Sequence, residues 1–287
     1  MKNYGEVFRE IRQSRNLSQE YVAGEVISVS QVSKFERGNH GISLDKFLYM
    51  IEKVGMTLGE FKFKAMGYEL DTLEKTMRDI QKMVVEQNRS GIERILSNEK
   101  KAKEKGDVFE EMNYLMFKSV ASTLDESLQL TDDEKERLVD YLYSIDDWGY
   151  HQLLIYGNSM QSLDMRHISR LTKELVLRSS FYDTIYENKR VIIKILLNSL
   201  LFAIDRNELS DATYFKKMAQ DFMVDETEVY ERTIFLFAKG MLDYRNGQIE
   251  QGEEKMLNAI DIFEKVGSVS LARNCKKDFE EVVNYRL

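Results

Sequence analysis

The 287-residue sequence contains no proline. Average usage of about 5% would give roughly fourteen. Proline breaks helix interiors because it lacks a backbone N–H and clashes with the preceding turn, so its absence favours helices. The period-two alternation of apolar and polar residues that is typical of strands is hard to find anywhere in the chain. The sequence therefore predicts an all-α fold.

The composition is that of a globular protein, with 43% hydrophobic and 31% charged residues. The length allows two domains. The sequence has no run of about 18 apolar residues, and the first residues, MKNYGEVFRE, lack the apolar core of a signal peptide. A single cysteine, Cys275, excludes a disulfide within the chain. We expect a cytoplasmic protein with no membrane contact.

The stretch LSQEYVAGEVISVSQVSKFERG, from Leu17 to Gly38, is typical of a helix-turn-helix. Ser18 can cap a first helix, in which Val22 and Val26 repeat at helical spacing. Ser28 can cap a second helix that ends at Gly38, a residue suited to a left-handed C-terminal turn.

The predicted second helix has two different faces. At about 100° per residue, Val32 and Phe35 fall together and should face the core. The opposite face carries short polar groups flanked by cations, which suits a helix that reads base edges and holds phosphates in a major groove. The alternative is an ordinary solvated polar face. Gln19 is expected to contact a phosphate, and Ser28 caps the helix. The predicted DNA-binding residues are Gln19, Ser28, Ser30, Gln31, Ser33, Lys34 and Arg37.

The charge is unevenly distributed along the chain. The formal net charge is -8, yet residues 1–64 hold ten basic and eight acidic residues. The remainder is therefore strongly acidic and should avoid a phosphate backbone. Any contact with DNA is expected from the N-terminal part alone.

Apolar residues around the motif predict further short helices, one before it near Val7 and two after it, near Phe47 and Phe61. Five helices in about 60 residues resemble the lambda-repressor and Cro-like DNA-binding domain of the XRE class. This resemblance implies that Arg12 and Glu36 pair inside the domain as structural residues. One departure is that the usual turn glycine is absent, with Ile27 near its place and a turn one residue shorter.

The rest of the chain predicts amphipathic helices whose consecutive pairs repeat at roughly 40 residues, the length of a helical-hairpin repeat. The predicted ranges are 70–87, 90–105, 107–125, 131–146, 149–160, 164–180, 187–206, 208–223, 228–246, 248–266 and 268–285.

The segment from Leu236 to Val266 resembles a tetratricopeptide repeat (TPR). Gly240, Gly252 and Ala259 fall at the small-residue positions of that motif, where the two helices of a hairpin touch. We therefore predict a right-handed superhelix of TPR-like hairpins over residues 70–287, following a DNA-binding domain over residues 1–65. A plain helical bundle is the alternative.

The whole chain resembles the Rgg (Rgg/GadR/MutR) transcription regulators of Gram-positive bacteria. The segments that carry this resemblance are VSQVSKFERGNHGISLDKF, WGYHQLLIYGNSM from Trp148 to Met160, and VIIKILLNSLLFAID from Val191 to Asp205. The resemblance implies a short secreted pheromone peptide bound on the concave face of the repeats, as in quorum sensing. It also implies a homodimer on palindromic promoter DNA.

Several kinds of chemistry find no support in the sequence. The three histidines belong to no H-E-x-x-H or Cys/His cluster, and no phosphate-binding glycine loop is present. Paired carboxylates lie at predicted helix ends, where capping and dipole effects explain them. We expect neither an enzyme nor a bound cofactor or metal.

A peptide groove would need aromatic residues and amides, although such residues more often fill a core or satisfy one another. Lys194, Asn198 and Phe202 repeat every four residues and so share one helix face. That face offers a cation for a peptide carboxylate, an amide for its backbone and a ring for an apolar side chain. The full predicted peptide-binding set is Tyr150, His151, Asn158, Tyr182, Tyr186, Lys194, Asn198 and Phe202.

The sequence thus predicts a dimeric, peptide-responsive transcription regulator. Two alternatives stay open. One is a protein-interaction adaptor whose helix-turn-helix no longer binds DNA. The other is a DNA-binding regulator whose repeats sense a small molecule or only dimerise.

Overall fold

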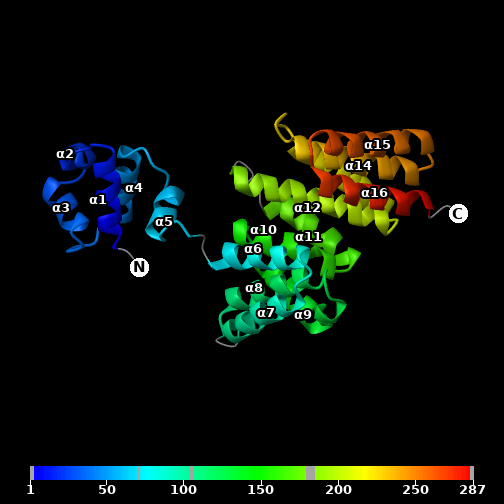
Figure 1. Cartoon of the computed structure of the whole chain (residues 1–287), viewed down its shortest axis with the longest axis horizontal. Helices are drawn as coiled ribbons and strands as arrows, with labels where there is room; N and C mark the ends of the chain where they lie inside the picture. Colours follow the sequence, from blue (N-terminus) through cyan, green and yellow to red (C-terminus); the bar gives the residue numbers. More distant parts are fainter. Residues whose placement is uncertain (1–2, 70–71, 104–105, 179–184, 285–287) are drawn as a thin grey trace. The chain divides into compact units, whose positions relative to one another are not determined.

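The computed structural model describes residues 3–69, 72–103, 106–178 and 185–284, and these residues are almost entirely helical (Figure 1). The all-α prediction is confirmed. The α-helices are α1 (Tyr4–Ser14), α2 (Gln19–Ala23), α3 (Val29–Glu36), α4 (Leu44–Lys53), α5 (Leu58–Ala65), α6 (Thr72–Val85), α7 (Arg89–Lys103), α8 (Val108–Ala121), α9 (Asp132–Ser144), α10 (Tyr150–Ser159), α11 (Met165–Arg178), α12 (Tyr186–Asp205), α13 (Leu209–Phe222), α14 (Val229–Arg245), α15 (Ile249–Lys265) and α16 (Val269–Asn284).

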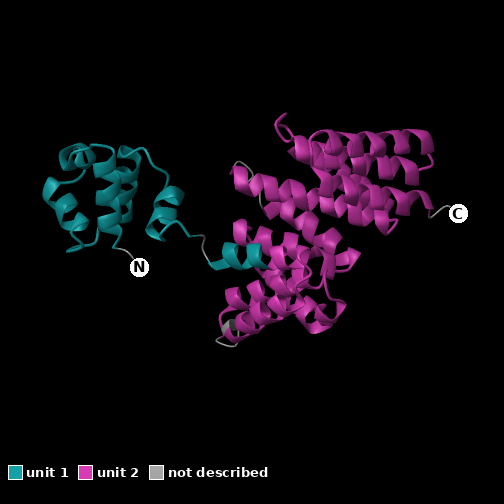
Figure 2. Cartoon of the chain, in the orientation of Figure 1, with its two compact units in different colours: residues 1–79 teal, residues 80–287 magenta. Residues whose placement is uncertain are grey.

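The chain forms two compact units, Met1–Asp79 and Ile80–Leu287 (Figure 2). The first unit holds the five helices of the helix-turn-helix region, and the boundary falls inside α6. No helix in the described part of the chain is long and apolar enough to cross a membrane.

The first unit is built around an apolar core to which all five of its short helices contribute. Its buried members are Val7, Phe8, Ile11, Val22, Ala23, Ile27, Val32, Phe35, Met50, Ile51, Val54, Phe61 and Ala65. Caps fix the helix starts: Ser18 accepts a hydrogen bond from the Tyr21 N–H, and Thr57 forms a capping box with Glu60. Local sequence signals therefore set the element boundaries, and core burial assembles the elements.

Helix α1 crosses α3 at backbone contact, through Gly5. A Cβ atom at Gly5 would lie 1.8 Å from the carbonyl oxygen of Phe35. No side chain fits in that space. Only glycine therefore lets α1 pack Val7 and Phe8 into the core that it shares with α3.

In the second unit, alternate helices form one continuous layer. Helix α8 contacts α10, α10 contacts α12, α12 contacts α14, and α14 contacts α16. We call these five the first-helix layer. The intervening helices α9, α11, α13 and α15 pack beside them, each near its sequence neighbours, as expected for stacked hairpins.

Helices α14 and α15 approach each other at backbone distance where Gly240 faces Gly252. A Cβ at Gly240 would lie 2.7 Å from the carbonyl oxygen of Gly252, and a Cβ at Gly252 would lie 2.7 Å from that of Gly240. Ala259 is also fully buried. The prediction that these small residues sit where the two helices touch is confirmed.

A buried polar chain ties α10 to its neighbours. Tyr156 donates from its hydroxyl to the carbonyl oxygen of Ile168 at 3.0 Å and lies 2.6 Å from the Thr172 hydroxyl, which is 2.8 Å from that of Ser199. Trp148 is fully buried and donates from Nε1 to the carbonyl of Leu142 at 3.1 Å. Each group of this chain has a partner, so the hydrogen bonds join α10 to α11 and α12.

Candidate DNA interface and ligand pocket

Helix α3 presents two faces, as the sequence predicts. Val32 is fully buried and Phe35 is 7% exposed, whereas Ser30, Gln31, Lys34 and Arg37 are exposed. Ser33 is partly exposed. Ser28 is the N-cap, and its side chain accepts a hydrogen bond from the Gln31 N–H at 3.3 Å.

Some of the predicted DNA-binding side chains already have partners within the unit. Arg37 donates from Nε to the Ser33 carbonyl at 3.1 Å, and Ser28 and Ser30 place their hydroxyls 3.2 Å apart. Gln31 accepts at Oε1 from the Lys46 ammonium at 3.3 Å. These bonds are all exposed. Side chains of this kind can exchange such partners for base edges or phosphates at small cost.

Arg12 and Glu36 form a bidentate ion pair beneath the recognition helix. Arg12 Nε lies 2.6 Å from Glu36 Oε1, and Nη2 lies 2.8 Å from Oε2. Arg12 Nη1 also donates to the Leu17 carbonyl at 2.6 Å. The hydrogen bond to Glu36 raises the pKa of Arg12. Glu36 is 1% exposed, so the pair joins α1 and α3 from inside.

Gln19 belongs to the same network. Its Nε2 donates to Glu36 Oε2 at 2.7 Å, so one amide proton is used inside the unit and one stays available. Helix α2 has only five residues, so its dipole offers little to a phosphate. Gln19 is therefore partly exposed and bound to Glu36 within the unit, and its predicted contact with a DNA phosphate stays a prediction.

The turn between α2 and α3 differs from the sequence expectation. Helix α2 ends at Ala23, and Gly24 follows with a φ of +51°. The interpretation that Val26 continues the apolar stripe is wrong: Val26 is 53% exposed, while Ile27 is buried. A glycine with positive φ, Gly24, does stand in the turn, three residues before Ile27. A Cβ at Gly24 would lie 2.1 Å from the Tyr49 hydroxyl, so both space and backbone require glycine there.

Two residues beside the recognition face were missed by the sequence reasoning. His40 and Lys46 line a small pocket of about 270 Å³ together with Gln31 and Lys34. Lys46 lies in the first turn of α4, a position that looked like part of a plain amphipathic helix in the sequence. Its hydrogen bond to Gln31 shows that the cationic surface extends from α3 to the start of α4.

The predicted peptide-binding residues divide between α10 and α12. On α10, Tyr150 is 42% exposed, and Asn158 donates from Nδ2 to the Leu154 carbonyl of its own helix at 2.8 Å. His151 lies with Nε2 2.9 Å from Asn113 Oδ1, and burial lowers the pKa of the imidazole. His151 is thus a half-buried link between α8 and α10.

On α12, Tyr186 is 62% exposed with the Arg190 guanidinium 5.6 Å from its ring centre, and Lys194 lies 6.0 Å from the centre of the Tyr230 ring. Asn198 is exposed and Phe202 is partly exposed. Tyr182 lies outside the described residues.

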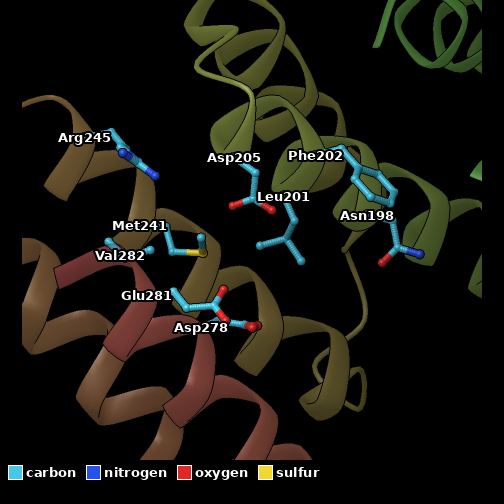
Figure 3. A pocket seen from close by; sticks show the side chains of 9 residues that line it. All are labelled: Asn198, Leu201, Phe202, Asp205, Met241, Arg245, Asp278, Glu281 and Val282. Carbon is cyan, nitrogen blue, oxygen red and sulfur yellow. The ribbon is translucent and has the colours of Figure 1, made fainter. Parts of the chain in front are cut away.

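Asn198 and Phe202 open into a pocket of about 430 Å³ on the first-helix layer (Figure 3). Three helices line it: α12, α14 and α16. The lining residues are Asn198, Leu201, Phe202, Asp205, Met241, Arg245, Asp278, Glu281 and Val282. The structure therefore brings two of the predicted peptide-binding residues together in one pocket, and Tyr150, His151, Asn158, Tyr186 and Lys194 do not line it.

The pocket contains three carboxylates that the sequence reasoning did not single out. Burial raises the pKa of Asp205, and Glu281 raises it further, while Arg245 and Arg206 act in the opposite direction. Burial also raises the pKa of Asp278, with further increases from Asp205 and Glu281 and a decrease from Lys277. Like charges held together in a partly shielded site explain both directions.

The arrangement shows no sign of catalytic chemistry. Within the described ranges, no group of three or more His, Cys, Asp or Glu residues is placed to hold a metal ion. Cys275 is buried, and burial raises the pKa of its thiol to about 11, which makes it a poor nucleophile.

The fold and the α3 surface are those of a helix-turn-helix unit joined to a second, larger helical unit. The model of the HTH-type transcriptional regulator Rgg C-terminal domain matches residues 94–277, and a helix-turn-helix model matches residues 8–61. The chain belongs to the Rgg family.

Solved structures agree with this assignment over nearly the whole chain. The SHP pheromone receptor Rgg2 of Streptococcus dysgalactiae is 26% identical, with a TM-score of 0.85 over 97% of this chain and 99% of that chain. The PrgX/cCF10 complex shows 15% identity and a TM-score of 0.74 over 99% of this chain and 93% of that chain. The PrgX/iCF10 complex shows 16% identity and a TM-score of 0.78, covering 100% and 98%. The PrgX likeness shows the fold.

Proposed function

We propose that this Rgg-family regulator is controlled by a short secreted peptide bound along the first-helix layer, as in quorum sensing by pheromones. The observation that carries the proposal is the pocket of about 430 Å³, into which Asn198 and Phe202 open. Its volume lies in the range of small-ligand sites, about 300–1,000 Å³, so it accommodates a few side chains of a longer ligand.

The lining of this pocket suits an extended peptide. The Asn198 amide can donate to a peptide carbonyl and accept from a peptide N–H at once. Phe202, Leu201 and Met241 provide apolar surface for a side chain. The Rgg2 relative, a pheromone receptor, supports the same reading at 26% identity.

The proposal includes predicted contacts outside the pocket. Lys194 lies one helical turn before Asn198 on α12, and Tyr150, His151 and Asn158 belong to α10, the preceding helix of the layer. We propose that a peptide longer than the pocket also contacts these side chains. Tyr186 lies at the start of α12.

On the DNA side, the proposed readers of base edges are Ser30, Gln31 and Ser33, with Lys34 and Arg37 on phosphates or guanine. Ser28 holds the start of α3, and Gln19 orients Glu36. One unit of this size covers a half-site, so a homodimer on a palindromic promoter is the arrangement we propose, with half-sites about one helical turn apart or a multiple of it.

The peptide hypothesis is tested by fluorescence polarisation with labelled synthetic peptides taken from short reading frames next to the gene. We expect one of them to bind the full-length chain and Asn198→Ala to weaken it about tenfold, or about 1.4 kcal/mol, because the peptide backbone loses its amide partner.

The control variant is Asn246→Ala, which changes an exposed asparagine at the C-cap of α14 that does not line the pocket. It should bind like the wild type. Equal affinity of wild type and Asn198→Ala would move the groove elsewhere. Failure of every peptide, with a small molecule binding instead, would replace the peptide by that ligand class.

A further inference from the structure

The pocket on the first-helix layer is chemically divided. Carboxylates from two helices that are far apart in the sequence, Asp205 of α12 and Asp278 and Glu281 of α16, point toward the same space (Figure 3). Leu201 and Phe202 of α12 and Met241 of α14 supply apolar surface beside them. A pocket that combines carboxylates with apolar side chains differs from the uniformly apolar interface between two stacked repeats.

Helix periodicity places the carboxylates on the pocket side of their helices. On α16, Asp278 lies four residues before Val282, which is 4% exposed, and three before Glu281. Residues at spacings of three and four share one helix face, and both carboxylates are exposed where they line the pocket. On α12, Asp205 lies seven residues after Asn198 and therefore faces the same way.

Basic groups only partly balance the pocket. Arg245 is the one basic residue among the described lining residues, against three carboxylates. Lys277 lies 3.6 Å from Glu281, and both side chains are largely exposed, at 77% and 66%. The Arg206 guanidinium lies 5.3 Å from the Phe202 ring centre. The raised carboxyl pKa values of Asp205 and Asp278 reflect burial and this excess of negative charge.

We propose that the ligand of this pocket presents a cationic group, a lysine or arginine side chain or a free amino terminus, to Asp205, Asp278 and Glu281. The inference rests on the proposed peptide function and defines the chemistry of the peptide. A lysine or arginine stem would lie along Phe202 and Leu201 while its charged end reaches the carboxylates, the division of labour usual for such side chains. An acidic group at the same place would be repelled.

The experiment uses the immobilised full-length chain and two random octapeptide libraries, one with free and one with acetylated amino termini. Retained peptides are sequenced by mass spectrometry and compared with the input. We expect the wild type to enrich lysine or arginine about tenfold at one position of the acetylated library if a side chain supplies the cation. If the amino terminus supplies it, retention is about tenfold higher from the free library and no position is enriched.

The variant is Asp205→Asn with Asp278→Asn, and the control is Asp221→Asn, an exposed residue of α13 outside the pocket. Asparagine keeps the shape and removes the charge, so the variant should still retain peptides but lose the preference for a cation. The Asp221→Asn control should keep the preference for a cation. Thermal melting checks that both variants fold, and Glu281→Gln provides a second test in which one carboxylate is removed.

Retained wild-type peptides without preference for a cation would overturn this inference and leave the peptide function standing. A preference that survives in the double variant would also overturn it. If the wild type retains no peptide above bare resin, the proposed peptide function fails, and the inference fails with it.

Discussion

Replacing Glu36 by alanine removes the acceptor of three hydrogen bonds inside the helix-turn-helix unit. Two come from Arg12, at 2.6 and 2.8 Å, and one from Gln19, at 2.7 Å. The Arg12 guanidinium is 9% exposed, so after the substitution a charge stays in a shielded site without its counter-ion. Breaking a buried pair in this way costs about 3–5 kcal/mol.

That cost is a large part of the stability available. The first unit spans residues 1–79, and at about 0.05–0.15 kcal/mol per residue it is stable by about 4–12 kcal/mol. We therefore expect Glu36→Ala to leave the helix-turn-helix unit marginal or unfolded, while the repeat unit keeps its stability. Loss of DNA binding would then follow from unfolding and not from a missing contact.

The assay is hydrogen exchange with mass spectrometry on the full-length chain, because it reports the two units separately. The slowest amides of α1 and α3 should exchange about two to four orders of magnitude faster in the variant, and those of α12 and α14 should not change. Glu10→Ala is the matched control: its carboxylate is 51% exposed and lies 3.7 Å from Lys64, so the loss should stay below about 1 kcal/mol.

A second variant separates charge burial from packing. In Arg12→Met with Glu36→Leu, no charge is stranded, so stability should return to within about 1–2 kcal/mol of the wild type. Wild-type exchange of α1 and α3 in Glu36→Ala would refute the structural role of the pair. A double variant as unstable as Glu36→Ala would show that the hydrogen bonds, and not the stranded charge, dominate.

Arg37→Ala should weaken binding to promoter DNA by about 1–3 kcal/mol in a mobility-shift titration at physiological salt without lowering the melting temperature; unchanged affinity would remove it from the interface. Gly240→Ala should destabilise the repeat unit by several kcal/mol, since its Cβ would meet the Gly252 carbonyl at 2.7 Å; urea unfolding followed by Trp148 fluorescence measures this, and a neutral result would contradict the close approach. Asp278→Asn should stabilise the chain at pH 7, because the pKa of Asp278 is higher in the folded than in the unfolded chain and its ionised form is therefore penalised on folding. The gain in stability should shrink as the pH falls toward about 4, where Asp278 takes up a proton. A stability difference that does not change with pH would count against the raised pKa.

Much of the fold could be predicted because its signals are local. Helix starts carry caps such as Ser18 and Ser28, and each side chain accepts the expected backbone hydrogen bond. The close approach of two helices at Gly240 and Gly252 could be predicted because the two glycines have the spacing of the small residues in a TPR-like motif. The two faces of α3 follow from helix periodicity alone.

What could not be predicted depends on contacts between distant segments. The carboxylates of the pocket, Asp205, Asp278 and Glu281, look like solvated surface charges until α12 and α16 are packed against the same space. The turn was misread because the pattern counted Val26 into the helix, whereas Gly24 ends it early. Tyr49 of α4 fills the space beside Gly24, a contact that the local pattern could not show.

The crossing of α1 and α3 at Gly5 has an evolutionary consequence. In an ordinary core contact, a larger side chain on one partner can be offset by a smaller one opposite. At Gly5 the opposing atom is the main-chain oxygen of Phe35, which every amino acid carries. A substitution at Gly5 therefore has no compensating replacement at position 35, and a descendant could leave glycine only by moving the whole helix.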